Sequence, residues 1–220
     1  MSNRLAVFDC DGTMLDSQAM ICTAMAQCFV ANDLPDPGEA ATRRIVGLSL
    51  PEAMQVLLPG AEPALLLRLT DSYKRAFHAM RLRGEIEEPL FAGIAEAIDT
   101  LDREGWLLGI ATGKSDRGLR HALEAHGLER RFVTLQTADR HPSKPHPAML
   151  HAAMAEAGAE PHMTVMIGDT SYDIAMAKAA GAHAIGVGWG YHPAEELFAA
   201  GADAVALVPG DLLRHIREMA

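Results

Sequence analysis

The 220-residue chain carries 19 basic and 29 acidic side chains, giving a formal net charge of −10, and 49% of its residues are hydrophobic. An acidic surface opposes broad contact with nucleic acids or anionic membranes, so we expect neither as a partner, and no apolar run approaches the roughly 20 residues that a membrane span requires. This composition excludes a disordered chain, and the length allows one large domain or a domain with a substantial insert.

Short apolar runs alternate with longer segments of helical period along most of the chain. The runs expected to be strands are Leu5–Phe8, Trp106–Ala111, Phe132–Gln136, Thr164–Ile167, His183–Val187 and Ala204–Val208. The segments expected to be helices are Ile94–Glu104, Asp116–His126, Pro147–Ala157, Tyr172–Ala180 and Pro193–Ala200, and a glycine follows each of them within two residues. This alternation predicts an α/β fold with a Rossmann-like parallel sheet core, covered by helices on both faces.

One region interrupts the alternation. After the first strand, helical patterns separated by Pro- and Gly-containing turns continue without a strand to about residue 83. We therefore expect residues 1–16 and 84–220 to form the α/β catalytic core, and residues 17–83 to form a helical cap domain inserted after the first strand.

Two carboxylates follow the first expected strand. Asp9 and Asp11 are separated by one residue, so in an extended chain their side chains face the same side and can share one pocket. Gly12 then supplies a turn and Thr13 a hydroxyl close to the same place. Carboxylates this close should either bind a cation or separate into a nucleophile and a proton donor.

Three further motifs stand at the ends of later strands or just before helices. Thr112 and Gly113 open a loop that can cradle a phosphate, and Lys144 stands in a proline-bracketed loop that limits its freedom. Asp169 ends a strand, and Asp173 follows it by four residues at the start of a helix. A turn or a helix cap could explain each motif alone, but together they lie where parallel sheets bind ligands.

The motif D-x-D-G-T-x-x-D, read with the other three in this order, resembles the haloacid dehalogenase superfamily in its phosphatase branch. The helical cap is similar to that of members resembling phosphoglycolate phosphatase. Many relatives carry Asn at the position of Gly113, a departure that removes one possible substrate contact here.

The carboxylates suit a hard cation, and Mg²⁺ fits best because no Cys or His stands at ligand spacing. The resemblance implies that the metal is bound by the Asp9 and Asp169 side chains and the Asp11 backbone carbonyl. It implies that Asp9 forms an aspartyl-phosphate, that Asp11 donates and accepts the proton, and that Lys144 neutralises charge, with Thr112, Gly113 and Gly12 binding phosphate. Asp173 and Thr13 are expected to orient these groups without themselves binding the metal or the phosphate.

The cap should contact the part of the substrate beyond the phosphate. Candidate contacts are Arg43 and Arg44, which could bind a carboxylate or a second phosphate, and Gly47 in the loop that follows. The segment Lys74–His78 is a second candidate. The expected substrate is a small phosphorylated metabolite, with phosphoglycolate-like acids as one candidate.

Other functions are considered on the same residues. A phosphomutase would carry a histidine in the linker Ser17–Met20, which has none. A phosphonate hydrolase would need a lysine in the first cap helix, about Ser17 to Val30, which contains none. Pyrophosphatase activity stays open, as does a non-catalytic phosphate-binding scaffold. Such a scaffold should have lost at least one of four residues, and all four are present: Asp9, Asp11, Lys144 and Asp169. Three cysteines without ligand spacing and no signal-peptide pattern predict reduced thiols and a cytoplasmic location. We expect a monomer or small homo-oligomer.

Overall fold

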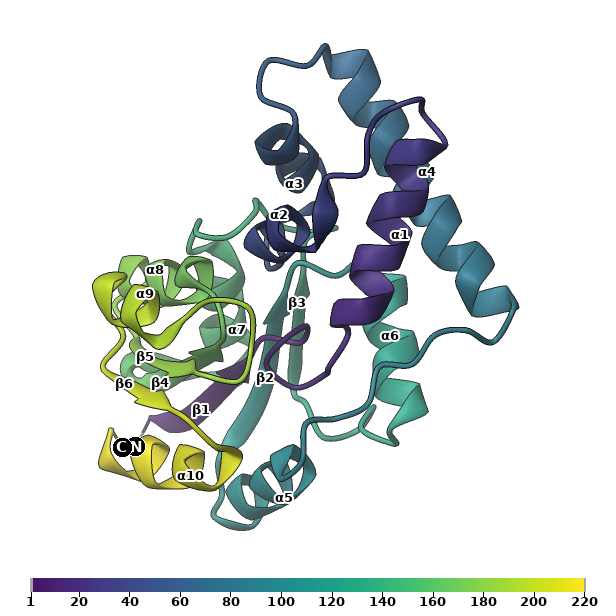
Figure 1. Cartoon of the computed structure of the whole chain (residues 1–220). Helices are drawn as coiled ribbons and strands as arrows, with labels where there is room; N and C mark the ends of the chain where they lie inside the picture. Colours follow the sequence, from purple (N-terminus) through teal and green to yellow (C-terminus); the bar gives the residue numbers. More distant parts are fainter. Residues whose placement is uncertain (1, 220) are drawn as a thin grey trace.

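A computed structural model describes residues 2–219 and shows one parallel sheet as the core of the molecule (Figure 1). The six strands lie in the order β3-β2-β1-β4-β5-β6, and every neighbouring pair is parallel. Their bounds are β1 Asn3–Phe8, β2 Leu107–Thr112, β3 Thr134–Thr137, β4 Ala159–Gly168, β5 His183–Val187 and β6 Ala204–Ala206. The predicted Rossmann-like α/β class is confirmed.

The strand order places the start of the chain at the centre of the sheet. From β1 the chain moves to β2 and β3 on one side, and then returns to β4 on the other side of β1. At such a reversal the loops after the two central strands turn apart and leave a crevice, which is where open α/β sheets bind ligands. Asp9 follows β1 and Asp169 follows β4, so both stand at this crevice.

Side chains of β1 alternate between two apolar layers. Leu5 and Val7 pack on one face of the sheet and Ala6 and Phe8 on the other, each completely buried. The first face is covered by α7 (Ala148–Ala157), α8 (Ser171–Ala179) and α9 (Ala194–Ala199), and the second by α5 (Ile94–Arg103), α6 (Asp116–Ala125) and α10 (Pro209–Glu218). Burial on both faces explains why these strands read as short, nearly continuous apolar runs.

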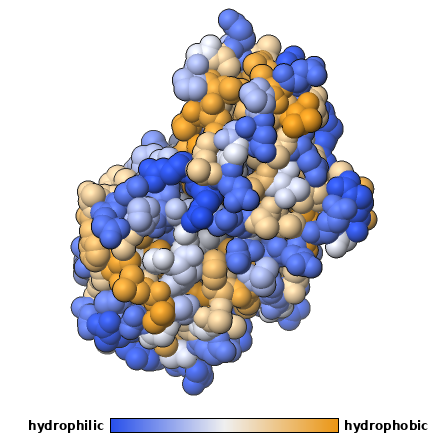
Figure 2. Space-filling model, in the orientation of Figure 1, coloured by the Kyte–Doolittle hydropathy of each residue, from blue (hydrophilic) through white to orange (hydrophobic). Residues whose placement is uncertain are grey.

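Four helices between β1 and α5 form a separate group, called here the helical insert. They are α1 (Gln18–Val30), α2 (Gly38–Ile45), α3 (Leu50–Leu57) and α4 (Pro63–Leu82), and they enclose an apolar cluster of their own. Figure 1 shows the insert standing beyond the carboxyl ends of the strands, so it faces the crevice. Figure 2 shows hydrophilic residues along much of the junction between the two parts on this face.

Helix α10 and strand β4 differ most from the sequence expectation. Helix α10 was not expected, although Leu212 and Ile216 are completely buried against the sheet four residues apart. Strand β4 begins at Ala159 rather than at Thr164, and its first part includes Pro161, which lacks the N–H that a strand interior normally donates. Among the helices of residues 2–219, none is long and apolar enough to cross a membrane.

Candidate active site

Asp9 lies at the carboxyl end of β1 and is 1% exposed. The ammonium Nζ of Lys144 is 2.8 Å from Asp9 Oδ1, whereas Asp9 Oδ2 has no hydrogen-bond partner among residues 2–219. Burial, opposed by Lys144 and assisted by Asp173, raises the pKa of Asp9 to about 7. A buried carboxylate oxygen with nothing to bind is costly, so this atom calls for a positively charged or electrophilic partner.

Asp169 lies beside Asp9 at the end of β4. The hydroxyl of Thr13 donates to Asp169 Oδ1 at 2.8 Å, and the Tyr191 backbone N–H donates to Oδ2 at 2.9 Å. Burial, reinforced by Asp9, still raises the pKa of Asp169 well above its ordinary value. A Cβ atom at Gly12 would lie 2.3 Å from Asp169 Oδ2, and the φ of Gly12 is +83°, so only glycine allows this close approach.

Asp173, at the start of α8, has both carboxylate oxygens occupied. Oδ1 lies 2.5 Å from Lys144 Nζ, and Oδ2 accepts the backbone N–H and the hydroxyl of Thr170 at 3.1 and 2.7 Å. Burial lowers the pKa of Lys144, but Asp173 and then Asp9 outweigh it and raise that pKa above its ordinary value. Lys144 is therefore a fixed ammonium ion held between two carboxylates.

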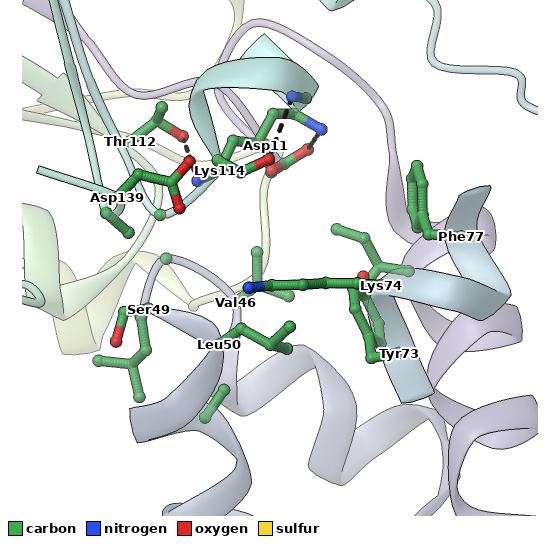
Figure 3. A pocket seen from close by; sticks show the side chains of 18 of the residues that line it. Asp11, Val46, Ser49, Leu50, Tyr73, Lys74, Phe77, Thr112, Lys114 and Asp139 are labelled. Carbon is green, nitrogen blue, oxygen red and sulfur yellow. Dashed lines mark hydrogen bonds and ion pairs between the residues drawn. The ribbon is translucent and has the colours of Figure 1, made fainter. Parts of the chain in front are cut away.

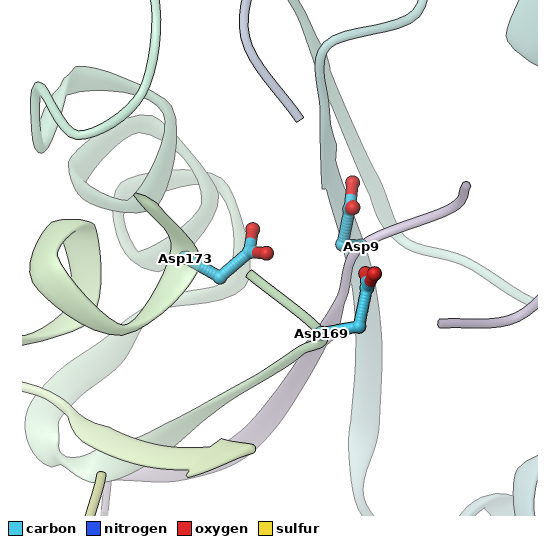
Figure 4. A group of neighbouring side chains, drawn as sticks. All are labelled: Asp9, Asp169 and Asp173. Atoms are coloured by element: carbon cyan, nitrogen blue, oxygen red, sulfur yellow. The ribbon is translucent and has the colours of Figure 1, made fainter. Parts of the chain in front are cut away.

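These carboxylates meet the requirement of a hard cation. One oxygen from each of Asp9, Asp169 and Asp173 lies within 4.8 Å of the others, and all three residues are buried (Figure 4). Asp9 and Asp169 both point toward the crevice, whereas Asp173 is committed to Lys144 and Thr170. Oxygen ligands of this kind suit Mg²⁺, and Asp173 fits better as the residue that orients Lys144.

Asp11 belongs to a second charged group, formed with Lys114 and Glu88. Its Oδ1 accepts the hydroxyl of Ser17 at 2.5 Å and lies 2.8 Å from Lys114 Nζ. Lys114 also contacts Glu88 Oε1 at 2.8 Å. Burial lowers the pKa of Lys114, but Asp11 and Glu88 together raise it well above its ordinary value, so this lysine is held as a cation.

The sequence analysis assigned a role to neither Lys114 nor Glu88. The position of Lys114 two residues after Thr112 was a usable signal, since it follows the same strand end. Glu88 stands in the irregular segment between α4 and α5, where neither spacing nor periodicity marks it.

Thr112 and Gly113 form the rim of the crevice after β2. The Lys114 backbone N–H donates to the Thr112 hydroxyl at 3.2 Å, and Ser115 caps α6 by accepting the Gly118 N–H. A Cβ atom at Gly113 would lie 2.6 Å from Leu48 O, so the loop between α2 and α3 rests directly on this rim. The predicted phosphate loop thus also forms the floor under the helical insert.

A cavity of about 380 Å³ opens between this rim and the helical insert (Figure 3), and Asp9 and Asp11 are among the residues that line it. Gly47 lines this cavity. Lys74, Phe77 and His78 of α4 also line it, and all three belong to the segment Lys74–His78 that the sequence analysis considered. The structure thus brings the core motif residues together with α4 and the α2–α3 loop.

The expectation that Arg43 and Arg44 reach the substrate is not supported. Neither lines the cavity. Arg44 pairs with Glu196 Oε2 at 2.7 Å, and Arg43 lies over the Tyr191 ring and donates to Gly190 O at 3.4 Å. These arginines lie on the side of α2 that meets the core, and a helical pattern alone could not show which side that would be.

Comparison with known proteins agrees with this geometry. The family model for haloacid dehalogenase-like hydrolases matches residues 6–187. The probable phosphatase IndB of Dickeya dadantii is 36% identical over 199 residues, covering 89% of this chain and 86% of that protein. A phosphoglycolate phosphatase of Mesorhizobium japonicum is 32% identical over 200 residues, covering 87% of this chain and 85% of its own length.

A solved structure extends the match to the whole chain. The crystal structure of a hydrolase from Pseudomonas syringae is 26% identical and has a TM-score of 0.87, covering 100% of both chains. The match extends from the second half of β1 to the end of β5 and includes Asp9, Lys144 and Asp169. As the motifs predicted, the chain belongs to the haloacid dehalogenase-like hydrolases.

Proposed function

We propose that this hydrolase is a Mg²⁺-dependent phosphatase that releases phosphate from a small phosphorylated metabolite through an aspartyl-phosphate at Asp9. The observation that carries the proposal is the buried Asp9, whose Oδ2 has no hydrogen-bond partner among the described residues and which lines the same cavity as Asp11 and Thr112. The names of the relatives support the class of reaction, and phosphoglycolate, named for one of them, is the first substrate to assay.

Asp9 acts as the nucleophile. One carboxylate oxygen attacks the phosphorus atom, the ester oxygen leaves, and the phosphoryl group stays on Asp9 until water hydrolyses it. Lys144, fixed by Asp173, neutralises charge on the phosphoryl oxygens as the bonds change. The Thr112 hydroxyl and the N–H groups around Gly113 and Gly12 bind the remaining oxygens.

Asp11 moves the proton. As an acid it protonates the leaving oxygen, and as a base it then takes a proton from the attacking water. Its Oδ1 accepts from Ser17 and Lys114, so its orientation toward the cavity is fixed on that side. Lys114 is therefore a positioning residue for Asp11 in this mechanism.

Mg²⁺ would be held by the side chains of Asp9 and Asp169 and by the backbone carbonyl of Asp11. When bound, it supplies positive charge that offsets repulsion between the carboxylates and the phosphate. Thr13 and the Tyr191 N–H keep Asp169 aimed at the crevice. Residues 17–83 would act as the cap of a core formed by 1–16 and 84–220, excluding water from the cavity and contacting the leaving group.

The test is phosphate release from p-nitrophenyl phosphate with Mg²⁺ and with a chelator, for the wild type and for Asp9→Asn. We expect turnover only in the wild type with Mg²⁺, and a phosphorylated protein detectable by mass spectrometry after rapid quenching. The matched control is Asp71→Asn, because Asp71 is exposed on α4 and should leave turnover unchanged. Turnover by Asp9→Asn would contradict the nucleophile, and no hydrolysis by the wild type would favour a phosphate-binding scaffold.

Phosphate-release assays with other substrates distinguish two alternative activities. Release of phosphate from pyrophosphate but not from esters would indicate a pyrophosphatase. Conversion of a sugar phosphate to its isomer without phosphate release would indicate a phosphomutase, which the missing linker histidine opposes.

A further inference from the structure

The cavity above the catalytic aspartates is large for a two-carbon acid. Its volume is about 380 Å³. Pockets of roughly 300–1,000 Å³ enclose ligands of drug size, whereas glycolate would leave most of this space to water. The size indicates a bulkier leaving group.

The walls supplied by the helical insert are largely apolar. Ile21 and Met25 of α1, Val46 of the α2–α3 loop and Leu50 of α3 line the cavity. Apolar walls gain free energy only by covering apolar ligand surface, and a carboxylate placed against them would lose water without replacing its hydrogen bonds. The part of the cavity that the helical insert lines therefore favours carbon-rich groups.

Two aromatic rings one turn apart on α4 form one side of this space. The ring centroids of Tyr73 and Phe77 are 6.0 Å apart at 34°, and both rings line the cavity (Figure 3). Phe77 is held in place by cations, with the Arg81 guanidinium 5.9 Å and the Lys114 ammonium 6.0 Å from its centroid. Fixed aromatic side chains favour contact with planar rings.

Lys74 lies between Tyr73 and Phe77 in the sequence and adds a polar group to the same cavity. Figure 3 shows its side chain extending from α4 across the cavity toward Val46 and Leu50. It takes part in none of the ion pairs found within residues 2–219. Its ammonium group is therefore available to a hydrogen-bond acceptor on the ligand.

We propose that the substrate is a phosphate monoester of a ring-bearing alcohol, of the nucleoside monophosphate class. Its planar ring contacts Tyr73 and Phe77, and an acceptor on that ring binds Lys74. This inference rests on the proposed phosphatase function and names the class of leaving group that the cavity selects.

The experiment compares kcat/KM for UMP, AMP and p-nitrophenyl phosphate with that for phosphoglycolate, all with Mg²⁺. We expect at least one nucleotide to exceed phosphoglycolate by about 10- to 100-fold, the range that ring contacts of this kind give. Phe77→Leu should reduce this preference about tenfold, and Lys74→Met should reduce it in a nucleotide-dependent way. Phe198→Leu, in an exposed phenylalanine remote from the cavity, is the matched control and should keep it.

A kcat/KM for phosphoglycolate equal to or above those for both nucleotides would overturn the inference while leaving the phosphatase proposal intact. An unchanged preference in Phe77→Leu and Lys74→Met together would also overturn it. Lys74 is exposed, so its replacement keeps the test valid even if Phe77→Leu does not fold. Absence of hydrolysis with every compound would instead refute the phosphatase function itself, and the inference with it.

Discussion

Gly113 and Leu48 lie so close that a single Cβ atom would not fit between them: built on Gly113, it would stand 2.6 Å from Leu48 O and 2.9 Å from Gly47 O. The neighbouring Ser49 N–H also donates to the Ser143 hydroxyl at 2.8 Å, next to Lys144. The α2–α3 loop is therefore seated on two loops of the core at once. Glycine at this position lets the helical insert approach the site closely.

Replacing Gly113 by Ala should displace that loop. Because the obstacle is backbone rather than a flexible side chain, we expect kcat/KM to fall about tenfold or more, as happens when positioning in a site is lost. Steady-state kinetics and thermal melting are the measurements. Gly210→Ala is the control, since a Cβ there meets nothing within 4 Å, and it should leave kinetics unchanged. Wild-type kcat/KM in Gly113→Ala would show that the loop adapts freely.

The stability of the metal-free protein should depend on Asp9 and on pH. The folded protein holds the Asp9 proton up to about pH 7, whereas the unfolded chain loses it near the ordinary value of 3.8. The free energy of unfolding therefore falls as pH rises from about 4 to about 7, because the folded state binds the extra proton. Asp9→Asn removes this effect, so in chelator its melting temperature should exceed the wild type's by more at pH 8 than at pH 5. Equal differences at the two pH values, or the same behaviour in Asp71→Asn, would contradict this account.

Mg²⁺ binding should strengthen with pH over the same range. Burial raises the pKa values of both Asp9 and Asp169, Asp173 adds to the rise at Asp9 and Asp9 to that at Asp169, and a cation must displace those protons. We expect Mg²⁺ to raise the melting temperature more at pH 8 than at pH 6, and to do so hardly at all in Asp169→Asn. A shift of wild-type size in that variant would place the cation elsewhere.

Lys114 should be important for stability as well as for turnover. Its Nζ bridges Asp11 and Glu88, whose side chains are only 12% and 7% exposed. Lys114→Met leaves the buried Asp11 without a cation and leaves Glu88 only the more distant Arg81 guanidinium at 3.9 Å, so the free energy of unfolding should fall by roughly 3–5 kcal/mol. Lys178→Met, which breaks the more exposed pair with Asp203, should cost no more than about 1 kcal/mol.

Urea denaturation measures both changes. The double variant with Glu88→Gln should lose less than the sum of the single losses, since Glu88 repels Asp11 once the lysine is gone. Additive losses would show that the two contacts of Lys114 are independent.

The sheet could be predicted because burial on both faces turns each strand into a short apolar run, and all six were expected. Helix α10 was missed because its buried residues, Leu212 and Ile216, are few and stand among charged neighbours. The start of β4 was misplaced because Pro161 is a poor strand residue, and only the fold supplies the pairing of Ala159 with Asn3.

The grouping of Asp9, Lys144 and Asp169 was predictable because each stands next to the carboxyl end of a strand or in a rigid loop. Contacts that depend on how the helical insert packs were not. Arg43 faces Gly190 instead of the cavity, and Glu88 reaches Lys114 across 26 positions of the chain. Local pattern fixes the face of a strand, but only tertiary packing decides which side of a surface helix meets the core.

The central place of β1 has a consequence for how this chain is made. The strand that precedes Asp9 is synthesised before both of its partners, because Leu107–Ile110 and Thr164–Ile167 come roughly a hundred and a hundred and sixty positions later. Until then both edges of Asn3–Phe8 stay open, whereas α1–α4 can assemble from contacts between near neighbours in the chain. On the ribosome the helices that cover the site can therefore form before the site exists, and the charged crevice closes only after most of the protein has emerged.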